Sequence, residues 1–217
     1  MRAARRAVSD ILTKSPIVAV LRAADARDYG RVVDVLVDNG IHSIELTLST
    51  PGTLEYLPAL LARLGSDVEI GIGTVVSREQ AQRALDCGAH FLVTPIMDLD
   101  VIALAVQRGV PVFPGGLTPT ELHAAWEAGA TAVKIFPAET VGPKYGSHLR
   151  GPFPELEFIP SGGVELDDIQ SWLGAGAVAV SLGGPLVGDS LRGGSMDALA
   201  QRAQKVVCLV ADLRAAG

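Results

Sequence analysis

The hydrophobic and polar positions of the chain follow one pattern that recurs along its length. A segment with helical spacing ends at a glycine, and a short apolar run follows at once. Glycine is common just past a helix end because that position needs a left-handed backbone, and short runs of β-branched and small residues are typical of buried parallel strands. The segments with this pattern are "VDNGIHSIEL", "LDCGAHFLVTP", "VQRGVPVFPG", "WEAGATAVKIFP" and "LGAGAVAVSLG". Each segment predicts a helix, a stop and a strand.

The spacing of these segments predicts eight strands. Their glycines lie one or two units apart, with a unit of roughly 20 to 25 residues, the size of one helix, one strand and two loops. The two longer gaps contain further apolar runs at 68–73 and 157–163, and another run, 16–22, precedes the first segment. The strands are expected near residues 19, 45, 70, 93, 113, 134, 159 and 179, with helices between them such as 26–39, 78–87 and 118–128.

This alternation predicts an α/β fold, a closed (β/α)8 TIM barrel that forms a single domain over residues 1–217. The segment Arg2 to Lys14 is predicted to be an extra amphipathic helix, so that residues 1–15 cap the barrel floor. An open, doubly wound sheet is the alternative fold. It is disfavoured because "GIGTVV" lacks the third glycine and the distant acidic residue of a dinucleotide-binding loop.

Composition and charge narrow the classes of function. The chain has 217 residues, of which 48% are hydrophobic and 19% charged, and its formal net charge of -6 argues against nucleic-acid binding. No apolar run reaches membrane-spanning length, and the run after the basic start "MRAARR" is too short for a signal sequence. Cys87 and Cys208 lie far apart and outside metal or redox spacings. Free thiols and a cytoplasmic location are therefore expected.

One lysine stands within an apolar strand, in "TAVKIFPAET". Alternation places Lys134 and Phe136 on the face opposite Val133 and Ile135, which would desolvate the amine. Desolvation favours a neutral amine that can attack a carbonyl, but a structural ion pair would also explain a buried lysine. Glu45 in "SIELTLS" is likewise a single carboxyl in an apolar strand. It is either the counter-ion of the lysine or a proton shuttle for its chemistry.

Two glycine turns, "PSGGVELDD" and "SLGGPLVG", follow the last two expected strands. Barrels commonly bind phosphate at this place through backbone amides, and here the donors would come from Gly162, Gly163, Gly183 and Gly184. A metal site is not expected, because the four histidines have no ligand spacing. Arg22 follows the first strand, where it would be either an anion-binding fork or part of a structural salt bridge.

The chain resembles the class I aldolases that cleave 2-keto-3-deoxy-6-phosphogluconate (KDPG) and 4-hydroxy-2-oxoglutarate (KHG). The resemblance rests on "VAVLR", "IELTL", "GIGTV", "FLVTP", "FPGGLTPTE", "VKIFPAE" and "GPFPELEFIPSGGV", which occur in the family's order along essentially the whole chain. It implies an aldehyde-lyase that yields pyruvate from a 2-keto acid, needs no cofactor or metal, and forms a homotrimer. It would serve carbohydrate metabolism in the Entner-Doudoroff pathway.

The same resemblance implies roles for individual residues. Lys134 would be the Schiff-base lysine, Glu45 the general acid and base, and Thr74 a ligand of the pyruvyl carboxylate, while Pro95 and Phe136 would form the pocket wall. Ser161 replaces the family's usual threonine and keeps its hydroxyl. The last turn, "GGPLV", lacks the serine that normally contacts phosphate.

Several alternatives therefore stay open. The substrate could be a related 2-keto-3-deoxy acid, either of the galactonate type or unphosphorylated. A phosphosugar isomerase or epimerase would share the glycine turns without needing an imine-forming lysine. A sugar-phosphate sensor on a barrel without catalysis would keep binding but have no turnover.

Overall fold

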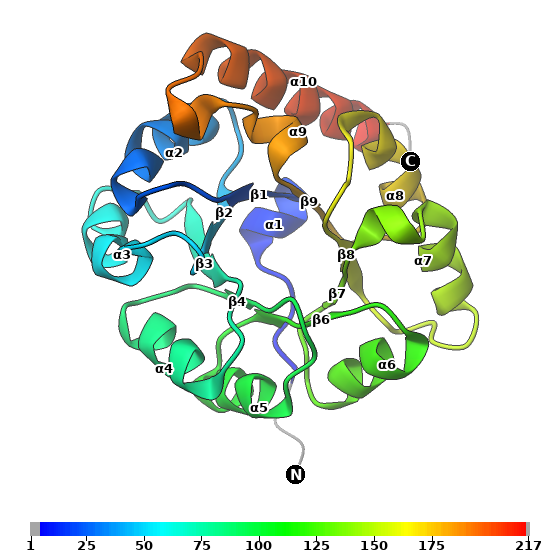
Figure 1. Cartoon of the computed structure of the whole chain (residues 1–217). Coiled ribbons are helices and arrows are strands. Elements are labelled where there is room, and N and C mark those ends of the chain that lie inside the picture. Colours follow the sequence, from blue (N-terminus) through cyan, green and yellow to red (C-terminus); the bar gives the residue numbers. More distant parts are fainter. Residues whose placement is uncertain (1–4, 216–217) are drawn as a thin grey trace.

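The strands form a ring with the helices outside it (Figure 1). The computed structural model describes residues 5–215. Its strands are β1 (Ile17–Leu21), β2 (Ser43–Thr47), β3 (Glu69–Gly73), β4 (Leu92–Val93), β5 (Val112–Phe113), β6 (Gly115–Gly116), β7 (Val133–Ile135), β8 (Phe158–Pro160) and β9 (Val180–Leu182). All pairings are parallel, in the orders β5-β4-β3-β2-β1-β9 and β6-β7-β8. The α/β barrel architecture predicted from the sequence is confirmed.

The two sheets meet at two places. Between β8 and β9, the Val178 N–H donates to the Phe158 carbonyl oxygen at 3.0 Å. On the other side, β5 and β6 are separated by Pro114 alone, and together they occupy the position of the fifth expected strand. Proline has no N–H to donate to a ladder, which explains the interruption. The Pro114 carbonyl still accepts from the Lys134 N–H at 2.8 Å, so the fifth strand continues to support β7.

The helices alternate with the strands as the pattern predicts. The longer ones are α2 (Tyr29–Asp38), α3 (Thr53–Leu61), α4 (Arg78–Asp86), α5 (Leu99–Arg108), α6 (Pro119–Glu127), α7 (Pro143–Arg150), α8 (Ile169–Gly174) and α10 (Met196–Ala215). Short turns of helix are η1 (Ala26–Asp28), η2 (Ala138–Thr140), η3 (Leu166–Asp168), α9 (Gly184–Val187) and η4 (Ser190–Arg192). The glycines that end the helical part of the five repeated segments all have positive φ angles; they are Gly40, Gly88, Gly109, Gly129 and Gly176. Within residues 5–215, no helix combines the length and apolar character needed to cross a bilayer.

The N-terminal helix is shorter than predicted. Helix α1 spans Asp10–Lys14, and the Ser9 hydroxyl caps it by accepting from the Leu12 N–H at 3.0 Å. The prediction of a helix was wrong for residues 5–9, and residues 1–4 lie outside the described part. Arg5 is instead held over the Trp126 ring, 3.2 Å from its centroid, and donates to the Trp126 carbonyl. Leu12 is buried with Val18 and other side chains of the barrel interior, so α1 does close the barrel floor.

Candidate active site

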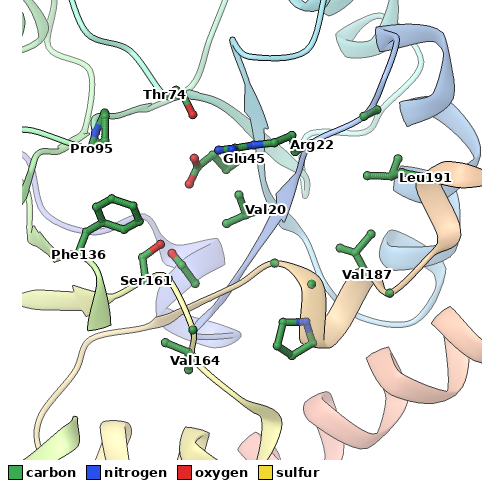
Figure 2. Close-up of a pocket in the computed structure, with 18 of the residues that line it drawn as sticks. Val20, Arg22, Glu45, Thr74, Pro95, Phe136, Ser161, Val164, Val187 and Leu191 are labelled. Atoms are coloured by element: carbon green, nitrogen blue, oxygen red, sulfur yellow. The ribbon is translucent and has the colours of Figure 1, made fainter. Parts of the chain in front are cut away.

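A cavity of about 490 Å³ opens at the carboxyl ends of the strands, where barrel enzymes carry their chemistry. Its wall contains every site residue predicted from the sequence: Arg22, Glu45, Thr74, Pro95, Lys134, Phe136, Ser161, Gly162, Gly163, Gly183 and Gly184. These residues come from seven strands or the loops after them. Figure 2 shows Glu45, Thr74, Pro95, Phe136 and Ser161 around one part of this space.

Lys134 projects from β7 into the barrel interior. Its neighbours Val133 and Ile135 are fully buried in the outer layer between strands and helices, as alternation predicts, while the lysine is 6% exposed and lines the cavity. Its Nζ lies 4.9 Å from the centroid of the Phe136 ring. Amine and ring therefore belong to one wall of the cavity. Lys134 is therefore placed where a ligand in the cavity could meet its amine.

Glu45 reaches the same cavity from β2. Its side chain is 1% exposed, and its Oε2 has no hydrogen-bond partner. Burial raises the pKa of Glu45 above its usual value of 4.5, and the charges of Lys134 and Arg22 oppose this shift. Figure 2 shows the Arg22 side chain extending beside Glu45. A buried carboxyl group with a raised pKa in a cavity is a candidate for proton transfer.

Glu45 and Lys134 do not form a direct ion pair. Every ion pair found among residues 5–215 involves other side chains, and Arg22 takes part in none of them. The structural salt bridges considered for Lys134 and for Arg22 are therefore not found in the described part of the chain. The two groups still act on each other electrostatically across the cavity. Both groups line the same cavity.

The loops after β1 and β3 are held in defined conformations. The Ala23 N–H donates to the Thr50 hydroxyl at 2.9 Å, which ties the residue after Arg22 to the loop that follows β2. Thr74 has a φ of 59°, in the left-handed region. A β-branched residue in this region is a clear outlier, and such strain clusters at functional sites. The backbone thus presents both Arg22 and Thr74 to the cavity.

The first glycine turn depends on its glycines. Gly162 and Gly163 have φ angles of 84° and 72°, and a Cβ on Gly162 would lie 2.9 Å from the Phe136 ring. A Cβ on Gly163 would lie 2.3 Å from Glu139 Oε2. The turn is joined to the loop after β7, because the Ala138 N–H donates to the Ser161 carbonyl at 2.8 Å. The ring of Phe136 and the backbone of this turn therefore pack as one unit beside Lys134.

Three features of the site were not predicted from the sequence. Ser181 of β9 is 5% exposed and lines the cavity, as the same alternation that was applied to Lys134 would have indicated. Gly73 makes room for Glu45, because a Cβ on Gly73 would lie 1.8 Å from Glu45 Oε1. Arg192 lines the cavity from η4, and no local pattern marks it.

The comparison with protein families decides the identity of this barrel. The family model described as "KDPG and KHG aldolase" matches residues 8–201. The chain belongs to the KDPG/KHG aldolase family. As a member of this family it is an aldolase, a carbon–carbon lyase.

Characterised relatives and solved structures agree with this family. The chain is 34% identical to a 2-dehydro-3-deoxy-6-phosphogalactonate aldolase of Escherichia coli K12, over 90% of this chain and 94% of that protein. It is 36% identical to a 2-dehydro-3-deoxy-phosphogluconate aldolase of Treponema pallidum, over 73% of this chain and 74% of that protein. A solved structure described as native KDPGal superposes with a TM-score of 0.86 at 32% identity, covering 92% of this chain and 96% of that one.

The cavity wall combines an amine, a buried carboxyl group and two guanidinium groups, those of Arg22 and Arg192. Among residues 5–215 no group of three or more His, Cys, Asp or Glu side chains is arranged to hold a metal ion. Two of the histidines have structural contacts: His90 Nδ1 accepts from the Ile70 N–H at 3.0 Å, and His42 Nδ1 lies 2.9 Å from the Asp67 carbonyl oxygen. Among the described residues that line the cavity, Lys134 supplies the amine and Glu45 the carboxyl group.

Proposed function

We propose that the protein cleaves a 2-keto-3-deoxy-6-phospho sugar acid, of the gluconate or galactonate type, to pyruvate and glyceraldehyde 3-phosphate. The observation that carries this proposal is the shared cavity of Lys134 and Glu45, in which a desolvated amine and a buried carboxyl group face one space without neutralising each other directly. The related acid 4-hydroxy-2-oxoglutarate, which would give pyruvate and glyoxylate, is the shorter substrate that the same machinery would accept.

The reaction follows from these two groups. The neutral Lys134 amine attacks the C2 ketone, and the carbinolamine loses water to give a protonated imine. Glu45 removes the proton of the C4 hydroxyl, the C3–C4 bond breaks, and its electron pair moves into the imine to form an enamine while the aldehyde leaves. Glu45 then returns the proton to C3. Water hydrolyses the resulting imine, which releases pyruvate and restores the amine.

The remaining lining residues bind the substrate in this proposal. Thr74 and Arg22 would hold the carboxylate, since a hydroxyl and a planar guanidinium both donate to carboxylate oxygens. Ser161 would donate to the substrate beside Lys134, with Pro95 and Phe136 as the apolar wall. Backbone amides of Gly162, Gly163, Gly183 and Gly184 would face the phosphate.

We further propose that the protein assembles as a homotrimer. Val76, Ile96 and Leu99 are the large hydrophobic side chains of residues 5–215 that are most exposed, at 44%, 48% and 56%. Val76 follows β3 in the loop that holds Thr74, Ile96 follows Pro95 in the loop after the neighbouring strand β4, and Leu99 is the first residue of α5. Exposed apolar side chains that follow neighbouring strands at the active-site end of the barrel fit contact with a second copy of the chain. A cytoplasmic location fits the free thiols of Cys87 and Cys208.

The test is turnover on defined substrates. The purified protein is incubated with the gluconate-type and galactonate-type phosphorylated acids and with 4-hydroxy-2-oxoglutarate, and pyruvate and the aldehyde are quantified together. The proposal requires equal amounts of pyruvate and glyceraldehyde 3-phosphate from at least one phosphorylated acid. Isomerisation of a phosphosugar without pyruvate release would support the isomerase alternative. Ligand binding without any turnover would support the sensor.

A further inference from the structure

We propose that Arg192 selects phosphorylated substrates by binding the terminal phosphate with its guanidinium group. The inference rests on the proposed function and adds a specificity-determining residue to it. The final glycine turn of this chain is Gly183-Gly184-Pro185, which offers no side-chain hydroxyl, and Pro185 has no N–H. Backbone amides alone would leave a doubly charged phosphate without a cationic partner at this turn. Arg192 lines the same cavity as these glycines and carries a guanidinium group.

The backbone around Arg192 is fixed by its neighbours. The Arg192 N–H donates to the Asp189 carbonyl at 2.8 Å, and Leu191 beside it is 7% exposed. Arg202 of α10 donates to the Leu186 carbonyl at 2.6 Å, which holds α9 and the turn before η4. The Arg192 side chain itself is exposed and takes part in none of the side-chain hydrogen bonds or ion pairs found among residues 5–215. Its donors are available to a ligand.

Leu191, the residue before Arg192, lies at the end of the cavity away from Thr74, Pro95 and Phe136 (Figure 2). Figure 2 shows Val187 and Leu191 on one side of the space, with Thr74, Pro95 and Phe136 on the opposite side. Gly162, Gly163, Gly183 and Gly184 line the same cavity, so Arg192 and both glycine turns border one space. A substrate held at C2 by Lys134 would extend its far end toward this region.

The charges of the cavity wall match a substrate with two anionic ends. Among the described lining residues the charged ones are Arg22, Glu45, Lys134 and Arg192, so three basic groups stand against one carboxyl although the whole chain has a net charge of -6. Arg22 extends beside Glu45, and Lys134 is the nucleophile of the proposed reaction. Arg192 is therefore the basic residue of the wall that can bind the second anionic end of the substrate, the phosphate. A guanidinium binds phosphate in a planar, bidentate geometry that amides cannot provide.

The experiment compares two substrates that differ in the phosphate alone. We measure kcat and KM of wild-type protein, Arg192→Ala and Arg192→Lys on a phosphorylated 2-keto-3-deoxy sugar acid and on its unphosphorylated counterpart. For Arg192→Ala, the ratio of kcat/KM between the two substrates should fall about tenfold to a hundredfold, through KM, because one charge-assisted contact is lost. Arg192→Lys should recover part of the ratio. Inorganic phosphate should inhibit Arg192→Ala at least about tenfold more weakly than wild type.

Arg31→Ala is the matched control, because it removes an exposed guanidinium of α2 that does not line the cavity. The inference is overturned if Arg192→Ala lowers kcat/KM equally on both substrates, if it changes neither, or if Arg31→Ala has the same effect. Arg192→Gln serves as a second variant if the alanine variant does not fold. Wild-type protein that releases no pyruvate from either acid would overturn the proposed function, a result that is distinct from an unchanged substrate ratio.

Discussion

The Glu45 side chain occupies the space that a side chain on Gly73 would need. A Cβ built on Gly73 would lie 1.8 Å from Glu45 Oε1 and 2.3 Å from its Cδ. The two residues belong to the neighbouring strands β2 and β3, in which Thr47 pairs with Gly73 and Glu45 with Gly71. Glycine at position 73 therefore lets the carboxyl group lie flat against β3 inside the cavity. Gly73 positions Glu45 without contacting a substrate itself.

Gly73→Ala should damage catalysis more than folding. The added methyl group pushes Glu45 away from β3, and a displacement of about 1 Å can cost about 100-fold in kcat. We expect a loss of about 1 to 3 kcal/mol in the free energy of unfolding, with the pyruvate adduct on Lys134 still formed. Gly174→Ala is the control, because a Cβ there meets nothing within 4 Å. Equal kcat for Gly73→Ala and wild type would contradict the positioning role.

Substitution of Thr74 should weaken substrate binding without lowering the free energy of unfolding. Its φ of 59° is strained for a β-branched residue, at a cost on the order of 1 to 3 kcal/mol. Thr74→Gly relieves this strain, so urea unfolding should show a free energy of unfolding equal to or above that of wild type. The lost hydroxyl should raise KM about tenfold or more, since hydrogen bonds to charged groups are strong. Thr74→Ser keeps the hydroxyl and should keep KM; a serine variant as impaired as the glycine variant would refute this role.

Glu45→Gln should stabilise the protein in a pH-dependent way. Burial raises the pKa of Glu45 above 4.5, so its contribution to stability is fully present below about pH 4.5 and is lost as pH rises through the raised pKa. Glutamine carries no charge at any pH. The variant should therefore exceed wild type in free energy of unfolding at pH 8, by on the order of 1 to 3 kcal/mol, and the difference should shrink toward pH 4.5.

The same variant should lose about 100-fold to 10,000-fold in kcat, because glutamine cannot accept the C4 hydroxyl proton. Urea titrations of both proteins at several pH values test the stability claim. A difference in free energy that does not change with pH, or a wild type more stable than the variant at pH 8, would show that burial of the carboxylate carries no cost.

Leu99→Glu combined with Ile96→Glu should break the proposed trimer. Charges at these exposed apolar positions would have to be desolvated in an interface. Light scattering coupled to size exclusion should give about three chains for wild type and a single 22.6 kDa chain for the double variant. Gln201→Glu, an exposed change on α10, is the control. A wild-type protein that elutes as a monomer would rule out the assembly.

Sequence periodicity was sufficient for the strand positions because parallel strands and helix stops leave strong local patterns. It did not indicate that the fifth strand is split at Pro114, because a run of apolar residues records burial and not which residue lacks an N–H for the ladder. The N-terminal helix was predicted too long because residues 5–9 have helical spacing, whereas in the structure Arg5 contacts the ring of Trp126, which is distant in sequence. Gly73 and Arg192 were missed because their roles arise from residues distant in sequence, which no local pattern records.

The proposed reaction depends most on the amine of Lys134 as the nucleophile. Incubation with pyruvate and borohydride, followed by peptide mass mapping, measures this directly, because borohydride fixes an imine as a stable amine. We expect a single 1-carboxyethyl group on Lys134 in wild-type protein and in Glu45→Gln, and none in Lys134→Ala. An adduct on another lysine, or no adduct in wild-type protein that still releases pyruvate, would contradict the role of Lys134 as the nucleophile.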